Sequence, residues 1–378
     1  MSSDYILPPA MLGILGGGQL AAMFTLAAKK MGYGVTVVDP DADAPAGKLA
    51  DVHLCANYTD HDALQTLAQC AAVTTEFENV SAASMTWLAQ YTHVSPSGDC
   101  VAIAQDREKE KAWIHKAGLA TVPYAMIYSA ADLQADYSHM LPGILKTATL
   151  GYDGKGQITV HNQDELIAAF NQLQQVRCIL EKKVDLHSEI SVVVARLQTN
   201  QLVSFPVAEN VHQNGILAYS LVPARLPADL LLQAQLMAKQ LAEAMDYIGV
   251  MAVEFFVVGS EMRLAINEIA PRPHNSGHYT LDACLSDQFE QQVRILCGLP
   301  PAKPDLLKPC CMVNILGDIW PKEGEPDWSL ILAHKACKLH LYGKKKVRKG
   351  RKMGHFTVLA DDVDQAFSTA HEIGGQLN

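Results

Sequence analysis

The chain has no long apolar run and no cysteine pattern typical of a disulfide framework or a zinc site. None of its 378 residues falls in a stretch long and apolar enough to span a membrane, and the first ten, MSSDYILPPA, lack the basic region and apolar core of a signal peptide. The nine cysteines are odd in number and include no C-x-x-C pair. We therefore expect a cytoplasmic protein with no membrane partner, whose cysteines are mostly small buried hydrophobic residues.

Basic residues are also in short supply, because 30 Lys and Arg stand against 40 Asp and Glu, a net charge of 30 − 40 = −10. This balance argues against general binding of nucleic acid. We find no internal repeat and no low-complexity segment. With 49% hydrophobic residues, the chain is typical of a globular protein of two or three domains, at roughly 150 residues each.

A hairpin near residue 260 is the most informative stretch. Val250 to Val258 and Met262 to Ile269 are rich in apolar and β-branched residues, and Gly259-Ser260-Glu261 between them predicts a short turn. If Val258 pairs with Met262, Glu254 and Glu268 lie on one face as diagonal neighbours, with Cα atoms roughly 7 to 8 Å apart. Two carboxylates on an apolar face need a counter-charge, and Mg²⁺ prefers oxygen ligands. The alternative is a hairpin with one solvated face.

A glycine-rich turn follows the first predicted strand. Met11 to Leu15 is apolar, Gly16 to Leu20 reads GGGQL, and Ala21 to Met31 favours a helix. Gly16, Gly18 and Ala21 satisfy the loose pattern G-x-G-x-x-G/A, and Asp39 ends the next strand, which is the arrangement of an NAD-binding site. Any turn that places a helix N-terminus against an anion uses the same glycines, so the dinucleotide interpretation is the weaker one.

Two acids follow another apolar run, Ala71 to Val73. Glu76 and Glu78 lie in the segment TEFENV, at the carboxyl end of a predicted strand, where open α/β sheets bind ligands. For Glu78 we favour the alternative that it belongs to a helix N-cap region.

A second domain is predicted to begin near Thr121, after the charged helix that starts at Asp106. Within it Lys146 ends a strand, and Gly151 to Gln157 reads GYDGKGQ. Successive glycine N–H groups form an anion-binding nest, and Lys146 and Lys155 add positive charge, so this loop is predicted to cover phosphates. A plain hairpin turn is the alternative.

Later segments are less specific. Glu181 to Val184 follows an apolar strand and is typical of a linker that binds adenine through its backbone, and Glu189 could hold a ribose. Asn210 to Gly215 is predicted to be a polar turn, and Pro227 to Tyr247 a long amphipathic helix that packs on the hairpin.

The basic residues are concentrated near the C-terminus. Lys335 to Lys352 holds seven Lys and two Arg, and residues 329–360 contain no Asp or Glu. Arginine forms bidentate bonds to phosphate, so Arg351 with Lys352 is predicted to bind one phosphate group. Lys344 to Lys346 could instead form a solvated surface.

Five motifs together, GGGQL, TEFENV, GYDGKGQ, NEIAPRPHNSGH and GRKMGH, resemble those of the N5-carboxyaminoimidazole ribonucleotide synthetases, the ATP-grasp enzymes of purine biosynthesis. The resemblance covers nearly the whole chain. It implies α/β and α+β structure in an ATP-grasp fold with three parts: a Rossmann-like pre-ATP-grasp domain over residues 1–120, a small lid domain over 121–206, and a larger C-terminal domain with the basic phosphate-binding loop over 207–378.

The resemblance also implies the roles of individual residues. Four match catalytic positions, namely Tyr152, Asp153, Arg272 and His274. The metal ligands are Glu254 and Glu268. The positions that match ATP-binding residues are Arg107, Lys146, Gly151, Tyr152, Asp153, Gly154, Lys155, Gly156, Gln157, Glu181, Lys182, Lys183, Val184, Glu189, His212, Asn267 and Glu268. Those that match substrate-binding residues are Gln19, Leu20, Glu76, Asn275, Ser276, Lys345, Arg348, Arg351 and Lys352. The run Lys344 to Lys346 is one residue longer than the usual loop, so which lysine reaches the phosphate stays open.

The activity that this resemblance implies converts ATP, bicarbonate and 5-aminoimidazole ribonucleotide into ADP, phosphate and the N5-carbamate through carboxyphosphate. It implies Mg²⁺, with Mn²⁺ as a substitute, a homodimer, and transfer of the product to the N5-carboxyaminoimidazole ribonucleotide mutase. Three alternatives stay open: a formate-using glycinamide ribonucleotide transformylase of the same superfamily, an NAD(P)-binding oxidoreductase, and a nucleotide-binding regulator without catalysis.

Overall fold

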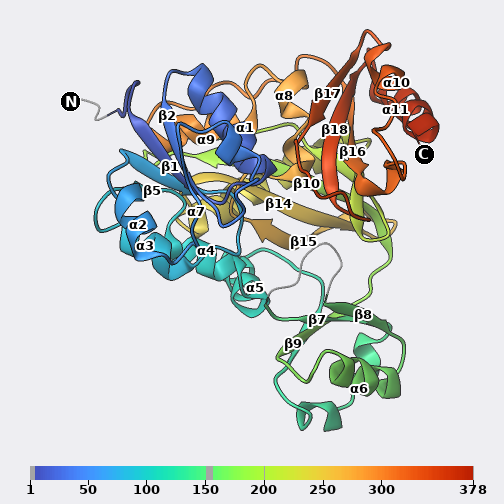
Figure 1. Ribbon diagram of the computed structural model, residues 1–378. Helices are drawn as coiled ribbons and strands as arrows, with labels where there is room; N and C mark the ends of the chain where they lie inside the picture. Colours follow the sequence, from blue (N-terminus) through green and yellow to red (C-terminus); the bar gives the residue numbers. More distant parts are fainter. Residues whose placement is uncertain (1–4, 150–155, 200, 378) are drawn as a thin grey trace.

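The computed structural model describes residues 5–149, 156–199 and 201–377, which form three β-sheets with helices packed on them (Figure 1). No helix among these residues is long and apolar enough to cross a membrane.

The N-terminal sheet is parallel, in the order β3-β2-β1-β4-β5. Its central strand β1 is apolar and nearly completely buried, as expected for a parallel strand covered on both faces. The strands are β1 (Met11–Leu15), β2 (Gly34–Val38), β3 (Val52–Leu54), β4 (Ala72–Thr75) and β5 (His93–Val94). The helices of this part are α1 (Gln19–Lys30), α2 (His61–Leu67), α3 (Ala82–Leu88), α4 (Gly98–Ala104) and α5 (Arg107–Lys116).

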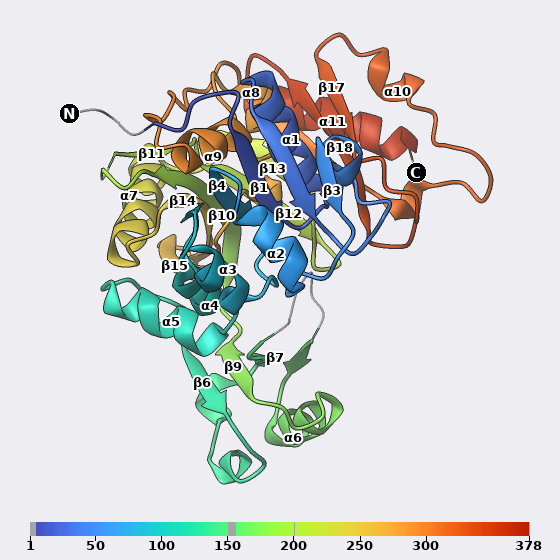
Figure 2. The same cartoon turned by 60° about the vertical axis from the view of Figure 1, so that its left-hand side comes forward.

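A small antiparallel sheet, in the order β6-β9-β7-β8, projects from the rest of the molecule (Figures 1 and 2). Its own core includes Leu145, Phe170 and Leu180. The elements are β6 (Tyr124–Ile127), β7 (Gly143–Thr147), β8 (Gln157–Val160), α6 (Gln163–Gln172) and β9 (Cys178–Lys182).

The third sheet has nine strands, in the order β15-β14-β10-β12-β13-β16-β18-β17, with β11 paired to β10. Its strands are β10 (Leu186–Arg196), β11 (Leu202–Ser204), β12 (Ala208–Gln213), β13 (Ile216–Val222), β14 (Gly249–Val258), β15 (Arg263–Ala270), β16 (Cys310–Leu316), β17 (Cys337–Leu341) and β18 (Lys352–Leu359). The helices are α7 (Ala228–Ala244), α8 (Thr280–Ala283), α9 (Gln288–Leu296), α10 (Ser329–Leu332) and α11 (Val363–Leu377).

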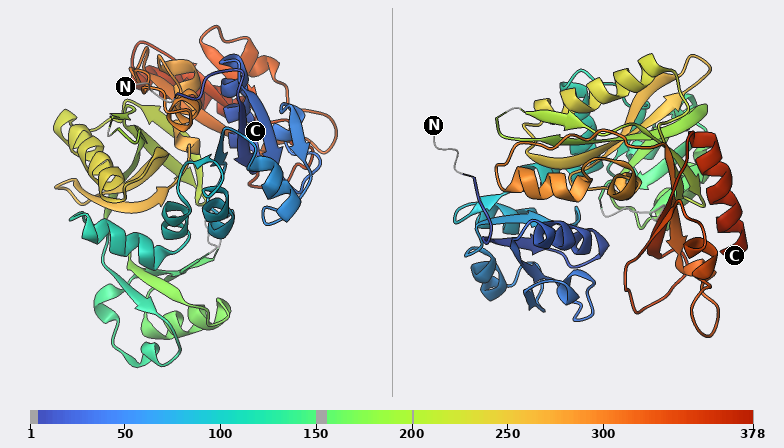
Figure 3. Two further views of the ribbon diagram at one scale, coloured as in Figure 1. Left: turned by 90° about the vertical axis from the view of Figure 1, so that its left-hand side faces the viewer. Right: turned by 90° about the horizontal axis from the view of Figure 1, so that it is seen from above.

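Strand β14 is covered on both faces, because its alternate residues belong to two different cores. Met251, Val253 and Phe255 pack with α7, whereas Val250 and Ala252 pack in the core that includes residues of α9 and β16. Figure 3 shows α7 (yellow) and α9 (orange) on opposite sides of these strands. Helix α9 also joins the core of α1 through Phe289 and Val293, so one helix attaches the N-terminal sheet to the large sheet.

The sheets divide the chain differently from the predicted domains at one point. The small domain was expected to end at residue 206, but β10 and β11 belong to the nine-stranded sheet. By strand pairing, the small unit ends with β9 at Lys182. We therefore propose three units with this second boundary moved to about residue 183.

The predicted hairpin is present, but its predicted register was wrong. Val258 pairs with Arg263 across a four-residue loop, and the pairing shifts by one position between Phe255 and Glu254. Asn267 is the extra residue of this β-bulge, so Glu254 lies directly opposite Glu268 rather than diagonal to it. Without the bulge Glu268 would face Val253 and point to the other side of the sheet, because side chains alternate along a strand.

A second correction concerns the segment predicted to be a polar turn at residues 210–215. Ala208–Gln213 forms β12, and only Asn214 and Gly215 make the turn, both with positive φ. The strand brings Asn210 opposite Glu189 of β10, a neighbourhood that a loop would not fix.

Candidate active site

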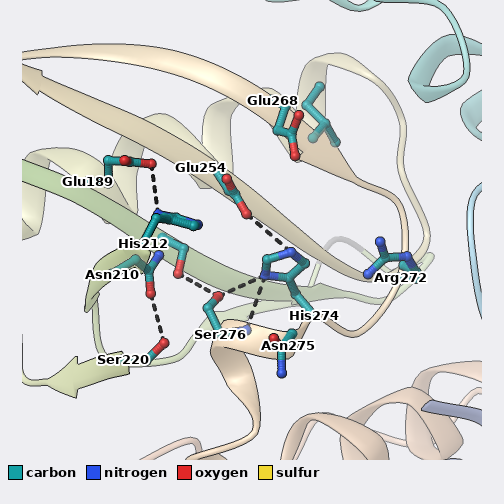
Figure 4. A network of polar contacts seen from close by, with 12 residues as sticks. Glu189, Asn210, His212, Ser220, Glu254, Glu268, Arg272, His274, Asn275 and Ser276 are labelled. Atoms are coloured by element: carbon teal, nitrogen blue, oxygen red, sulfur yellow. Dashed lines mark hydrogen bonds and ion pairs between the residues drawn. The ribbon is translucent and has the colours of Figure 1, made fainter. Parts of the chain in front are cut away.

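The two carboxylates of the hairpin face each other across β14 and β15, on the face that also carries His274 (Figure 4). Directly paired residues have Cβ atoms roughly 4.5 to 5.5 Å apart. Burial, with the nearby charge of Glu268, raises the pKa of Glu254 to about 8. The positive charge near the pair is therefore too small to keep Glu254 ionised at neutral pH.

His274 connects Glu254 to the segment after β15. Its Nε2 lies 3.1 Å from Glu254 Oε1, and its Nδ1 accepts a hydrogen bond from the Ser276 amide at 3.3 Å. Burial and the Arg272 charge hold the pKa of His274 well below its usual range. A neutral ring that accepts at Nδ1 carries its proton at Nε2, so it donates to Glu254 and orients that carboxylate.

A second group of charges lies between α5 and the small sheet. Arg107 Nη1 is 3.4 Å from Glu268 Oε2. Glu181 of β9 lies between two lysines, 2.5 Å from Lys146 Nζ and 2.9 Å from Lys111 Nζ. Although burial opposes it, the charges of Lys146 and Lys111 lower the pKa of Glu181 to about 2. Of these, only Lys111 was absent from the predicted set.

Glu189 and His212 meet on neighbouring strands of the large sheet. His212 Nδ1 is 3.2 Å from Glu189 Oε2, and despite burial the bond to Glu189 raises the pKa of His212. Figure 4 shows these two predicted residues on one side of Glu254, with Glu268 on its other side.

Glu78 is a functional candidate that the sequence interpretation had assigned to a helix N-cap region. Helix α3 begins at Ala82 with Ser81 as its cap, so Glu78 caps no helix. Its Oε2 accepts from Arg272 Nε at 2.5 Å, and although burial opposes it, the Arg272 charge lowers the pKa of Glu78. Glu78 and Arg272 are 194 residues apart, so no local sequence pattern predicts that they pair.

The glycine-rich turn before α1 holds the protein's own acids. Glu76 Oε2 accepts from the Ala21 amide at 3.2 Å, and Asp39 Oδ2 accepts from Gly17 at 2.8 Å. A Cβ at Gly18 would lie 2.0 Å from Glu76 Oε1, so a larger residue there would displace the Glu76 carboxylate. Because Asp39 also binds the Tyr58 hydroxyl at 2.9 Å, the acid expected to bind an NAD ribose is already engaged.

The basic cluster approaches this turn from the C-terminal strands. Burial, together with the Arg351 charge, lowers the pKa of Lys344 to about 8, while Glu76 opposes the shift. Lys344 Nζ donates to the Lys352 carbonyl at 2.8 Å. Lys345, the lysine in the predicted set, instead pairs with Asp43 at 2.6 Å and its side chain is 64% exposed. The structure therefore directs Lys344, not Lys345, toward Glu76.

Other predicted substrate residues have side chains that contact only protein partners. Leu20 is in the core beneath α1. Asn275 exchanges amide hydrogen bonds with Asn314, at 2.9 and 2.7 Å, and the Ser276 hydroxyl is 2.6 Å from that of Ser191. The side chains of Asn275 and Ser276 are thus buried and hydrogen-bonded within the protein. Gln19 opens α1.

The phosphate-covering loop falls partly beyond the described residues. Gly151, Tyr152, Asp153, Gly154 and Lys155 lie outside them. Gly156 has φ +72° and accepts from the Thr147 amide, and Gln157 pairs with Lys146 as β8 begins. Lys182 is the last residue of β9, Lys183 and Val184 follow it, and both lysines are exposed.

The donors present fit a hard divalent cation that shares its ligands with phosphate. Glu254 and Glu268 offer carboxylate oxygens only, which suits Mg²⁺. Among residues 5–149, 156–199 and 201–377, no group of three or more His, Cys, Asp and Glu is arranged to hold a metal by itself. Two carboxylates are the protein ligands expected for a Mg²⁺ ion whose coordination is completed by the phosphates of a nucleotide.

Comparison with known families agrees with this geometry. Residues 112–289 match the ATP-grasp domain, residues 10–105 the ribonucleotide synthetase pre-ATP-grasp domain, and residues 310–369 the phosphoribosylaminoimidazole carboxylase C-terminal domain. The chain is thus an ATP-grasp ligase, with ATP as its co-substrate.

Its relatives define the family more narrowly. The chain is 44% identical over 367 residues to the N5-carboxyaminoimidazole ribonucleotide synthase of Bacillus subtilis, covering 97% of this chain and 95% of that protein. A crystal structure of the ADP complex of such a synthetase has 40% identity and a TM-score of 0.92, covering 99% of this chain and 98% of the other. The enzyme of Aspergillus clavatus, in complex with ADP and 5-aminoimidazole ribonucleotide, has 28% identity and a TM-score of 0.86, covering 97% and 98%. The chain belongs to the N5-carboxyaminoimidazole ribonucleotide synthase family.

The raised pKa of Glu254 predicts a pH dependence of stability in the absence of divalent metal. Its pKa is about 8 in the folded state against an ordinary value of 4.5, so the folded state binds more protons than the unfolded state between these values. Stability should therefore fall as pH rises from about 5 to 8.

Glu254→Gln should remove this contribution, because the amide does not titrate. Urea unfolding of wild type and variant across that range, in EDTA, measures it as the wild-type minus variant difference. A difference that stays constant with pH would contradict the assigned ionisation.

Proposed function

We infer that the protein carboxylates 5-aminoimidazole ribonucleotide with bicarbonate at the expense of ATP, in purine biosynthesis. The observation that carries this inference is one arrangement of charges: the acid pair Glu254 and Glu268, with Arg107 and Lys146 on one side and the basic cluster with Glu76 on the other. Phosphorylation of bicarbonate to carboxyphosphate creates a leaving group that bicarbonate lacks, and the amine of the ribonucleotide then attacks carboxyphosphate or the CO₂ released from it.

We propose that Glu254 and Glu268 hold Mg²⁺, with Mn²⁺ able to replace it. When bound, the ion would supply positive charge to the nucleotide's phosphate oxygens. Around it we propose that Lys146, beside Glu181, and Arg107, beside Glu268, bind phosphate oxygens, while His274 keeps Glu254 in one orientation. The loop from Gly151 to Gln157 is proposed to cover the phosphates, with Tyr152 and Asp153 close to the reacting groups. Asn267, Glu181 to Val184, Glu189 and His212 complete the proposed nucleotide site.

On the other side, Lys344, Arg348, Arg351 and Lys352 are proposed to bind the 5′-phosphate of the ribonucleotide. The charges of Arg351, Lys352 and Arg348 each lower the pKa of Lys344, which requires the four side chains to lie close together. Gln19 is the first residue of α1, and the carboxylate of Glu76, which follows β4, accepts from the Ala21 amide in the same turn. Although burial opposes it, the charges of Glu78, Glu268 and Glu76 raise the pKa of Arg272. Arg272 therefore joins the two halves of the proposed site.

Two further properties rest on the resemblance to the family. We propose that the protein acts as a cytoplasmic homodimer and that its product passes to the N5-carboxyaminoimidazole ribonucleotide mutase. Sedimentation analysis of the purified protein would test the first property.

Changing Glu268 to Gln should abolish ribonucleotide-stimulated phosphate release from ATP. The variant keeps the shape of the side chain but leaves one carboxylate where the proposed site needs two. The measurement is phosphate release at saturating ATP, Mg²⁺ and ribonucleotide, with Glu261→Gln, on the exposed hairpin loop, as the control. Turnover equal to wild type would refute the metal assignment.

Arg351→Ala should weaken binding of the ribonucleotide far more than binding of ATP. Loss of a charge-assisted hydrogen bond is worth roughly 1.5 to 3 kcal/mol, equal to about a ten- to hundredfold rise in KM for the ribonucleotide. Lys344→Ala should act in the same direction.

Lys345→Ala is the matched control, since its side chain pairs with Asp43 in solvent. Steady-state kinetics with each substrate varied in turn measures the effect. Equal rises of both KM values, or a rise for Lys345→Ala alone, would contradict the placement of the phosphate.

Labelled substrates test bicarbonate against formate, the substrate that accepts the phosphoryl group in the related transformylases. ¹⁴C-bicarbonate should enter the product when ATP and 5-aminoimidazole ribonucleotide are present, and ¹⁴C-formate should not. Because the carbamate loses CO₂ in acid, the product is trapped at alkaline pH before counting. Incorporation of formate would replace the proposed reaction with formyl transfer.

A further inference from the structure

Lys111 is a completely buried cation that none of the roles above uses. It lies on α5, one turn after Arg107, and its side chain is 0% exposed. A buried ammonium is costly unless it is paired and hydrogen-bonded. Lys111 meets that requirement with two partners from different parts of the fold: Nζ lies 2.9 Å from Glu181 Oε1 and donates to the Asn267 carbonyl at 2.8 Å.

Asn267 is the extra residue of the β-bulge, so this bond falls on the position that sets the orientation of Glu268. The pairing of β14 with β15 changes register there, and only this change puts Glu268 on the face of Glu254. A bulge leaves one residue outside the regular ladder, so its backbone needs another partner. The Asn267 side chain supplies no anchor, since its Oδ1 has no hydrogen-bond partner among the described residues.

Neighbouring residues of α5 hold the same stretch of β15. Glu110 Oε1 accepts from the Ile269 amide at 2.6 Å, and Arg107 approaches Glu268 itself. Side chains of one helix thus contact three successive residues of β15: Asn267, Glu268 and Ile269. Residues 107, 110 and 111 share one helix face, because i, i+3 and i+4 are neighbours on a helix.

The second partner of Lys111 connects this strand to the small sheet. Glu181 of β9 bonds both Lys111 and Lys146 of β7, and Arg177 beside β9 pairs with Asp106 at 2.6 Å, at the start of α5. Lys111 therefore contacts both the bulge and the carboxylate that holds Lys146.

We propose that Lys111 is a positioning residue that fixes the bulge at Asn267, sets Glu268 opposite Glu254, and ties that placement through Glu181 to Lys146. The inference rests on the proposed metal role of Glu268. It explains why the lysine is buried at a site where Glu181 already has Lys146 as a partner.

The test measures metal binding directly, without turnover. Free Mn²⁺ is titrated by electron paramagnetic resonance with saturating ADP, for wild type, Lys111→Met, Lys111→Arg and Glu268→Gln. Lys111→Met should raise the Kd of Mn²⁺ roughly ten- to hundredfold, the usual effect of removing a group that supports a metal ligand. Lys111→Arg, which keeps the charge and donors, should recover most of the affinity. Lys109→Met, on the exposed side of α5, is the matched control and should bind as wild type.

Hydrogen exchange of the amides of residues 267–269 in metal-free protein gives a second readout. Protection there should fall in Lys111→Met and not in Lys109→Met. If Lys111→Met does not fold, Lys111→Gln replaces it, because a neutral amide is tolerated better beside Glu181 and is too short to reach both partners.

The inference would be overturned if folded Lys111→Met, or its Gln replacement, bound Mn²⁺ with wild-type affinity and Glu268→Gln still lost affinity. Wild-type affinity in Glu268→Gln would instead refute the metal assignment and the inference with it. Weakening by Lys109→Met equal to that by Lys111→Met would also overturn it, since the effect would then not be specific to the bulge.

Discussion

The opposition of Glu254 and Glu268 across a buried hairpin is the constraint on which the rest of the site depends. Two carboxylates on one apolar face repel each other and lose solvation, which is why the pKa of Glu254 is raised. The surrounding structure compensates without neutralising the pair: His274 donates to one acid and Arg107 approaches the other. The remaining deficit of positive charge makes the pair suited to a cation brought with the phosphates of ATP.

Each neighbouring unit contributes to this pair from a different direction. Helix α5 contacts β15 around Glu268 and also carries the residues that bind Glu181 and Arg177 of the small sheet. The N-terminal sheet reaches the same centre through Glu78, which holds Arg272 just after β15. These contacts place one hairpin at the junction of all three units.

Most of the candidate site residues could be located from the sequence because they lie in short motifs, and the reaction was predicted from the resemblance that these motifs carry. The hairpin, the helix after GGGQL, the acids after β4 and the basic cluster were all expected from the sequence, and the fold and family were confirmed. The turn that is β12 and the helix-cap interpretation of Glu78 share one cause, because each depends on a partner strand or side chain distant in the chain that no local pattern contains. The hairpin register was wrong for another reason: the bulge at Asn267 inserts one residue between two strands that are adjacent in the chain.

By itself, the sequence determined the class of elements and the identity of the groups available: apolar strands from their composition, an anion-binding turn from its glycines, and paired acids from their spacing. Only the tertiary structure decided how these groups are used. A single inserted residue at Asn267 chose the face of Glu268, since side chains alternate along a strand. Burial likewise distinguished Lys344 from the adjacent Lys345, because the environment of a side chain depends on the packing of distant segments, which neighbouring residues in the chain do not share.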